Sequence, residues 1–252
     1  MTLTSFTTEH PYRSSAWFLL IVVFVLIALA VINLLFLIGI LVQVAAVDLI
    51  LAIIGIFLLT RLDWWGKAGY TTGIRLAHVP LFILPCAIAL LSLAEGIRVT
   101  APVEILTFAA LTLVVGFAEE TYFRGLILTS LLPTGTIRAV ILSSFVFAVL
   151  HLLNIIGGTW DPFYTVVDTV AAFGLGITLA AIRLRTGSIW PLVGIHALFD
   201  FTSLIAMGGI DVPAQSSRVL FISILIGIVF VAYGLFLLRN EISGAIQRPV
   251  IS

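Results

Sequence analysis

The chain has 252 residues, of which 62% are hydrophobic and only 10% are charged. About a quarter of the residues of a soluble domain are charged, so the composition predicts an all-α, polytopic membrane protein that forms a single integral membrane domain over residues 1–252. The net charge is zero and no basic tract is present, so nothing points to a nucleic-acid partner. The single cysteine, Cys86, excludes an internal disulfide and a cysteine-rich metal site.

About eight segments are apolar enough to be transmembrane helices, which need about 20 mostly apolar residues. In chain order they are Trp17 to Leu41, Val44 to Leu59, Ala77 to Ala94, Val103 to Leu132, Ile137 to Ile156, Phe163 to Leu184, Ile189 to Met207 and Val219 to Leu238. The first segment is too long for a signal peptide and has no clear cleavage site, so we expect it to remain in the protein.

The positive residues favour one orientation in the lipid bilayer. Nine of the twelve Lys and Arg residues lie in the connections on the side of both termini, while Arg98 and Arg218 lie on the opposite side and Arg124 lies within a span. Because cytoplasmic loops are enriched in Lys and Arg, we expect both termini in the cytoplasm, which requires an even number of spans. The expected location is a bacterial plasma membrane. In the longest polar connection, we expect Trp64 and Trp65 to be interfacial anchors.

The fourth span carries three charged residues, Glu119, Glu120 and Arg124, inside an apolar run from Ile105 to Leu132. One charge at the centre of a membrane helix costs from about 2.5 to more than 10 kcal/mol, so three charges need partners. Glu120 and Arg124 are four residues apart and can pair on one helix face. This pairing leaves Glu119 as the carboxylate free for chemistry.

Two later pairs of spans bring further polar residues to a similar depth. At 1.5 Å per residue, Glu119 and His151 lie about 20 Å from the cytoplasmic turn that joins their spans. His196 and Asp200 are four residues apart on one face, about 12 and 18 Å from the next cytoplasmic turn. Costly residues at one depth on three helices predict a water-filled cavity with a function.

Four other residues of the spans bear on the site: two lie near His151, and two are further carboxylates. Phe147 and Asn154 lie about one turn before and after His151, where they can wall and orient the imidazole. Asp168 has no matching partner in the sequence and is expected to be structural or to face water. Asp48 lies near the end of a span.

This set of residues permits two kinds of chemistry. A carboxylate with an imidazole can deprotonate a water that attacks a carbonyl, while a second histidine donates to the oxyanion. Alternatively, Glu119, His151 and His196 could hold a divalent metal such as zinc with an open position for water. The motifs Gly-x-Ser-x-Gly and His-Glu-x-x-His are both absent. The sequence therefore leaves the use of a metal open.

Three motifs occur in order along the chain: Glu-Glu-x-x-x-Arg at 119–124, Phe-x-x-x-His at 147–151 and His-x-x-x-Asp at 196–200. They resemble the motifs of the CAAX prenyl endopeptidase and bacteriocin-processing (CPBP, formerly Abi) family of intramembrane proteases. The resemblance covers the core from Val103 to Phe201, including the stretch that begins Gly174-Leu175-Gly176. The other spans match only as apolar helices.

The resemblance implies an intramembrane endopeptidase that cleaves a membrane-associated peptide or lipidated protein near the cytoplasmic face. Glu119 would be the general base that activates water, helped by His151. His196 and Asp200 would form the oxyanion side. Members of the family are described both as metalloproteases and as metal-free glutamate enzymes.

The same resemblance implies that Glu120 and Arg124 are a supporting pair. The third motif takes Asn or Asp in this family, and here it is Asp200. An ionised Asp cannot donate a hydrogen bond, so Asp200 would either orient His196, which then becomes the donor, or stay protonated.

Two other functions remain compatible with the sequence. Buried Glu, Asp and His residues also suit the proton relays of a proton-coupled transporter, although no inverted repeat is visible. A non-catalytic membrane protein, such as an immunity or scaffold protein, would retain the fold without the chemistry.

Overall fold

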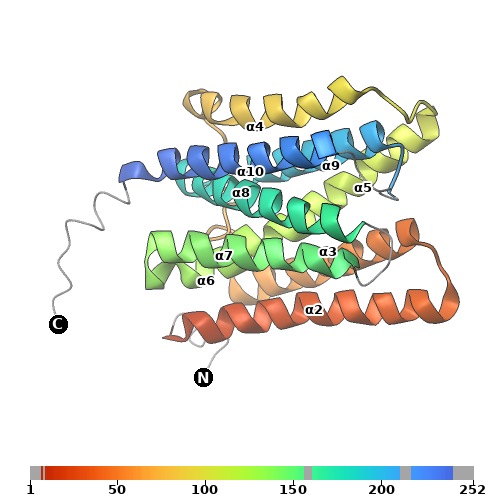
Figure 1. The fold of residues 1–252 in the computed structure, drawn as a ribbon. Coiled ribbons are helices and arrows are strands. Elements are labelled where there is room, and N and C mark those ends of the chain that lie inside the picture. The colour runs from red at the N-terminus through yellow and green to blue at the C-terminus, as the bar shows by residue number, and fades with distance from the viewer. Residues whose placement is uncertain (1–6, 8, 156–160, 211–216, 241–252) are drawn as a thin grey trace.

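The structure, a computed structural model, describes residues 7, 9–155, 161–210 and 217–240 (Figure 1). The helices in chain order are α2 (Pro11–Phe36), α3 (Ile40–Leu62), α4 (Pro80–Leu91), α5 (Pro102–Glu120), α6 (Leu128–Leu131), α7 (Thr136–Leu150), α8 (Pro162–Thr186), α9 (Trp190–Met207) and α10 (Ser217–Leu237). Within the described residues, seven helical segments are long and apolar enough to cross a membrane. The prediction of an all-helical integral membrane protein is therefore confirmed.

Proline begins helix α8 and glycine ends it, as the backbone chemistry of these two residues favours. Helix α8 has Pro162 in its first turn, where the missing N–H is no loss. The side chain of Asp161 caps the same end by accepting a hydrogen bond of 2.8 Å from the backbone N–H of Tyr164. The helix ends at Gly187, whose φ of +71° lies in the left-handed region that glycine adopts without strain.

Helix α4 is shorter than the span expected from Ala77 to Ala94. Its apolar helical stretch runs only from Pro80 to Ala94, below the length of the seven spanning segments. The backbone nevertheless ties both ends of this segment to α9: Ile189 donates to the carbonyl of Gly69 before α4, and Arg98 after α4 donates to the carbonyl of Ile205. Helix α4 therefore runs along the length of α9 and connects the two ends of the bundle.

The first and last helices are consistent with an even number of crossings. Figure 1 shows that α2 begins and α10 ends at the same end of the bundle. We call this the terminal end, and the other end the distal end. The terminal end also carries the turn from α8 to α9, at Gly187. The cytoplasmic location of this end stays a prediction from the charge count.

Helix α8 is the centre of the bundle. Of its most apolar 18 residues 61% are buried, compared with 17% in α2 and in α10, so α2 and α10 present most of their surface to lipid. Glycines let neighbouring backbones approach α8 closely: a Cβ added at Gly174 would lie 2.3 Å from the carbonyl oxygen of Gly227 on α10. The hydroxyl of Thr178 donates across the same interface to the carbonyl of Phe230, at 2.7 Å.

The segment between α3 and α4 packs onto the terminal end. The Trp64 side chain is only 2% exposed and contacts Phe18 edge-on, with ring centroids 6.3 Å apart. Trp64 is thus part of the protein core, and its expected role as an interfacial anchor is wrong; Trp65 instead packs on Tyr70. The guanidinium of Arg183 fixes the segment by donating to two of its carbonyls, at 3.2 and 2.6 Å.

Candidate active site

The first motif lies where the helix changes its winding. After Glu120, residues Thr121–Ile127 form a π-helical stretch before α6 continues the rod. Such stretches are rare, and they occur frequently at functional sites. All seven residues of this stretch are buried, so the change in winding takes place inside the bundle. It sets the direction of the Arg124 side chain relative to that of Glu120.

Glu120 and Arg124 form the pair that their spacing predicted. Nη1 of Arg124 lies 2.7 Å from Oε1 of Glu120, and both side chains are almost fully buried. The same Oε1 lies 2.8 Å from Nδ1 of His196 on α9. Because a carboxylate paired with arginine can only accept, Nδ1 of His196 carries the proton and donates it. Glu120 therefore orients the histidine, and only Nε2 of His196 is left to face the cavity.

Two carboxylates lie near that remaining nitrogen. Oε2 of Glu119 and Oδ2 of Asp200 are each 3.6 Å from Nε2 of His196. These distances are too long for direct hydrogen bonds but short enough for strong electrostatic interaction. The side chains of Glu119 and Asp200 are 28% and 36% exposed, whereas Glu120 is fully buried. Of the two adjacent glutamates, Glu119 is the one accessible to a substrate or a water.

Phe147 lies at the centre of the second motif. Its ring contacts the rings of His151 and His196, with centroids 4.9 and 5.7 Å apart. Its face lies 4.3 Å from the guanidinium carbon of Arg124. Its carbonyl bonds Nδ1 of His151 at 3.0 Å, which directs Nε2 of His151 away from the backbone. The side chain of Asn154 lies outside the described part of the structure, so its expected role in orienting His151 stays a prediction.

The polar residues meet in a cavity of about 360 Å³. Glu119, His151, His196 and Asp200 all line it, so the structure brings these four predicted residues together. In the described part of the chain, however, no hydrogen bond or ion pair joins His151 to Glu119. A water or a substrate group between them is required if the two act together.

The cavity occupies only the distal half of the bundle. Lining residues of α3 all fall between 40 and 51, those of α8 between 164 and 175, and those of α9 between 196 and 207. In α3 and α8 these residues are at the beginning of the helix, and in α9 they extend to its end. The cavity therefore runs from Glu119 and His196 towards the distal end.

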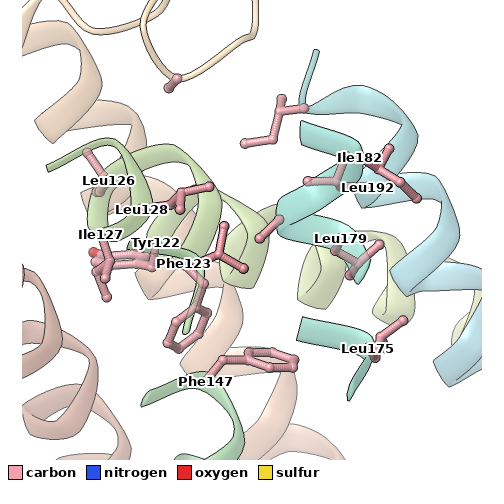
Figure 2. Close-up of a cluster of buried hydrophobic side chains, with 14 of the residues drawn as sticks. Tyr122, Phe123, Leu126, Ile127, Leu128, Phe147, Leu175, Leu179, Ile182 and Leu192 are labelled. Atoms are coloured by element: carbon pink, nitrogen blue, oxygen red, sulfur yellow. The ribbon is translucent and has the colours of Figure 1, made fainter. Parts of the chain in front are cut away.

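Buried apolar side chains gather in the terminal half, and Figure 2 shows part of this cluster with Leu126, Leu179 and Leu192. These residues and their neighbours are at most 1% exposed: Leu126, Ile127, Leu128, Leu179, Ile182 and Leu192. Phe123 and Phe147, whose rings meet edge-on with centroids 5.1 Å apart, belong to this group of side chains in Figure 2 and also line the cavity.

Two carboxylates and a tyrosine that the sequence did not assign to the site also line the cavity. Asp48 was noted only for its place near a span end, and Asp168 was expected to be structural or to face water. Both face the same cavity as Glu119, together with Tyr122 from the π-helical stretch. The signal for the two aspartates was their presence inside apolar spans, where an unpaired carboxylate is costly. Helix depth alone could not show which way they face.

The candidate metal ligands do not form a metal site. In the described part of the chain, no group of three or more His, Cys, Asp or Glu side chains could hold a metal ion. His196 and His151 use Nδ1 for contacts with Glu120 and with a backbone carbonyl, which leaves Nε2 of each ring to face the cavity. Because no group of three ligands is assembled among the described residues, we derive no step through a metal.

Comparison with known proteins gives a match over the part of the chain that carries these residues. No curated protein matches the chain. A family model described as type II CAAX prenyl endopeptidase, Rce1-like, matches residues 101–202. This range contains all three motifs and the four residues Glu119, His151, His196 and Asp200. The match confirms the resemblance to the CPBP proteases over the segment that carries the site.

Proposed function

We propose that the protein is an intramembrane endopeptidase that hydrolyses a peptide bond of a membrane-associated substrate with a water activated by Glu119. One observation carries this proposal. Glu119 faces the cavity, and its Oε2 lies 3.6 Å from Nε2 of His196, while Nδ1 of the same ring is hydrogen-bonded to Glu120. A base, an oriented imidazole and a cavity large enough for a peptide segment are the minimal parts of a water-based protease.

Glu119 acts first as a general base. Its carboxylate accepts a proton from a water in the cavity as the water oxygen attacks the carbonyl carbon of the scissile bond. The bond from the water oxygen to the carbon forms while the carbonyl π-bond becomes an oxyanion. The proton held by Glu119 then moves to the amide nitrogen as the carbon–nitrogen bond breaks. His151 lies on the same cavity and supports the water from the other side.

His196 stabilises the oxyanion. Because Nδ1 donates to Glu120, a protonated His196 presents Nε2–H to the cavity as a hydrogen-bond donor of fixed direction. Asp200, 3.6 Å from Nε2, is a counter-charge to that protonated ring. In this mechanism, the orienting role that the sequence considered for Asp200 belongs to Glu120.

The half of the bundle that holds the cavity suggests the route of the substrate. The excess of Lys and Arg favours a cytoplasmic location for the terminal end, and a bacterial plasma membrane remains the expected site. We infer that the substrate enters from the distal end, which faces away from the cytoplasm. Cleavage near the cytoplasmic face, as first expected, would require a route through the packed cluster around Leu126 and Leu179. A prenylated or otherwise lipidated protein remains one candidate substrate.

The proposal is tested by replacing Glu119 with Gln, which keeps the size and removes the base. Membrane peptides are compared by proteomics in cells that carry the active protein or the Glu119→Gln variant, and candidate products are then tested with purified protein in lipid nanodiscs. Glu104→Gln is the matched control, because Glu104 is an exposed residue of the same helix. We expect products with the wild type and with Glu104→Gln only. Full activity of Glu119→Gln would overturn the proposal, and proton-coupled substrate uptake without cleavage would favour a transporter.

A further inference from the structure

The cavity wall has an unbalanced charge. Four carboxylates line it, those of Asp48, Glu119, Asp168 and Asp200. Among the described residues that line the cavity there is no Lys or Arg, and the only other titratable side chains besides tyrosine are His151 and His196. Arg124 is occupied by Glu120 behind the wall. The described cavity wall therefore carries four acidic side chains and only two histidines.

Asp48 is the carboxylate that the proposed hydrolysis does not use. Its side chain is only 5% exposed, yet it lines the cavity beside Val44, Val47 and Leu51, on one face of α3. In the described part of the structure no hydrogen bond or ion pair satisfies it. It lines the same cavity as Glu119, His196 and Asp200, so it faces the space that holds the reacting groups.

A buried carboxyl group of this kind is ionised only with a partner of opposite charge, and the described part of the protein does not supply one. An unpaired charge in an apolar environment is strongly destabilising unless an opposite charge and hydrogen bonds compensate it. The two nearby carboxylates, Glu119 and Asp200, make the potential at Asp48 still more negative. The partner that fits is therefore a cation which enters the cavity from the distal end.

We propose that Asp48 binds a cationic group of the substrate, the guanidinium or ammonium group of an Arg or Lys side chain next to the scissile bond. The choice of a peptide as the ligand rests on the proposed function, whereas the binding of a cation rests on the wall of the cavity. The apolar neighbours Val44, Val47 and Leu51 contact the aliphatic part of such a side chain, and the carboxylate binds its charged end. The same wall disfavours a substrate that brings a free carboxylate into the cavity.

A pair of small probes tests the binding without the need for a known substrate. n-Butylguanidinium carries the charged end of an arginine side chain, and n-butylurea is its neutral isostere. Dissociation constants are measured for the full chain in nanodiscs, from the rise in unfolding temperature with probe concentration. Asp48→Asn keeps the shape and removes the charge. Asp63→Asn is the matched control, because Asp63 caps the other end of α3 and is exposed.

For the wild type and Asp63→Asn, we expect n-butylguanidinium to bind at least about tenfold more tightly than n-butylurea, and for Asp48→Asn we expect the two constants to become similar. A preference that persists in Asp48→Asn, or equal binding in the wild type, would overturn the proposal. Since removal of an unpaired buried charge does not weaken the fold, Asp48→Asn is expected to unfold at or above the wild-type temperature.

A second measurement separates this proposal from the proposed hydrolysis. Quenched fluorescent peptides that carry arginine or citrulline at each position are offered to the wild type and to Asp48→Asn. If cleavage occurs and kcat/KM falls about tenfold on exchange of arginine for citrulline in the wild type only, both proposals stand. Cleavage with no dependence on arginine would overturn the role of Asp48 alone. Binding of n-butylguanidinium that requires Asp48, without cleavage of any peptide, would leave the cation site standing and count against hydrolysis.

Discussion

Nδ1 of His196 lies 2.8 Å from Oε1 of Glu120, although the two residues are 76 positions apart in the sequence. This contact joins the first and third motifs through fully buried atoms. The two adjacent glutamates therefore have different roles: Glu120 holds Arg124 and His196 in place, whereas Glu119 faces the cavity. The consequences of this division can be measured separately for folding and for catalysis.

Replacement of Glu120 with Gln is expected to destabilise the fold more than the same replacement of Glu119. Glu120→Gln leaves the buried Arg124 without its counter-charge, and removal of one partner of a buried ion pair costs about 3–5 kcal/mol. Glu119→Gln leaves no buried charge unpaired and should retain nearly the full free energy of unfolding. The measurement is unfolding in mixed detergent micelles. Partial recovery in the double variant Glu120→Gln/Arg124→Gln would identify the unpaired arginine as the cause, and equal losses in the two single variants would contradict the division.

Replacement of Phe147 with Leu is expected to lower both stability and kcat. Each aromatic pair contributes about 0.5–1.5 kcal/mol beyond the area that it buries, and Phe147 contacts Phe123, His151 and His196. The loss of ring contacts should also let the histidines move, and such misplacement lowers kcat by about ten- to a hundredfold. Phe145→Leu is the control, because Phe145 is 56% exposed on the same helix. A lower stability with an unchanged kcat would mean that Phe147 only packs.

The sequence predicted those parts of the site that depend on the geometry within each helix. The pairing of Glu120 with Arg124 follows from their spacing, and the shared depth of Glu119 and His151 follows from the helical rise. The contact of Glu120 with His196 depends instead on how α5 packs against α9. A Cβ at Gly116 of α5 would lie 2.9 Å from the carbonyl oxygen of Val193, so this close approach needs a glycine. Helical periodicity carries no information on such contacts between distant segments.

Two other findings depend on direction rather than on depth. Asp48 and Asp168 were visible as carboxylates in apolar spans, but only the packed bundle shows that both face the cavity. Trp64 and Trp65 are adjacent in a polar connection, which is typical of interfacial anchors. The connection folds back over the terminal end, and this buries Trp64 against Phe18. The rotation of a helix about its axis and the path of a loop are both set by tertiary contacts.

Replacement of Gly174 with Ala is expected to separate α8 from α10. The added methyl would lie 2.3 Å from the carbonyl oxygen of Gly227, and backbone atoms cannot yield as a flexible side chain does. Overpacking of this kind costs about 1–3 kcal/mol. Gly194→Ala on α9 is the control, since a methyl added there would meet no atom within 4 Å and alanine favours the helix. Thermal unfolding in nanodiscs distinguishes the two, and similar unfolding temperatures for both variants would contradict the close packing of α8 on α10.

Replacement of Tyr70 with Phe tests the link between the α3–α4 segment and the first motif. The Tyr70 hydroxyl is hydrogen-bonded to the hydroxyl of Thr121, which directly follows Glu120. Loss of one buried hydrogen bond costs about 1 kcal/mol near neutral pH. Tyr12→Phe is the control, because Tyr12 is exposed.

The cost of Tyr70→Phe should also depend on pH. Burial raises the pKa of the Tyr70 hydroxyl above its ordinary value of 10.0. Above that value the unfolded chain loses this proton while the folded protein keeps it, so the stability contributed by Tyr70 is present at lower pH and decreases as the pH rises. The difference in unfolding free energy between the wild type and Tyr70→Phe should therefore be larger at about pH 8 than at about pH 11. If this difference in unfolding free energy is equal at both pH values, the Tyr70 hydroxyl ionises as readily in the folded protein as in the unfolded chain. Such a result would contradict the packing of the α3–α4 segment against Thr121.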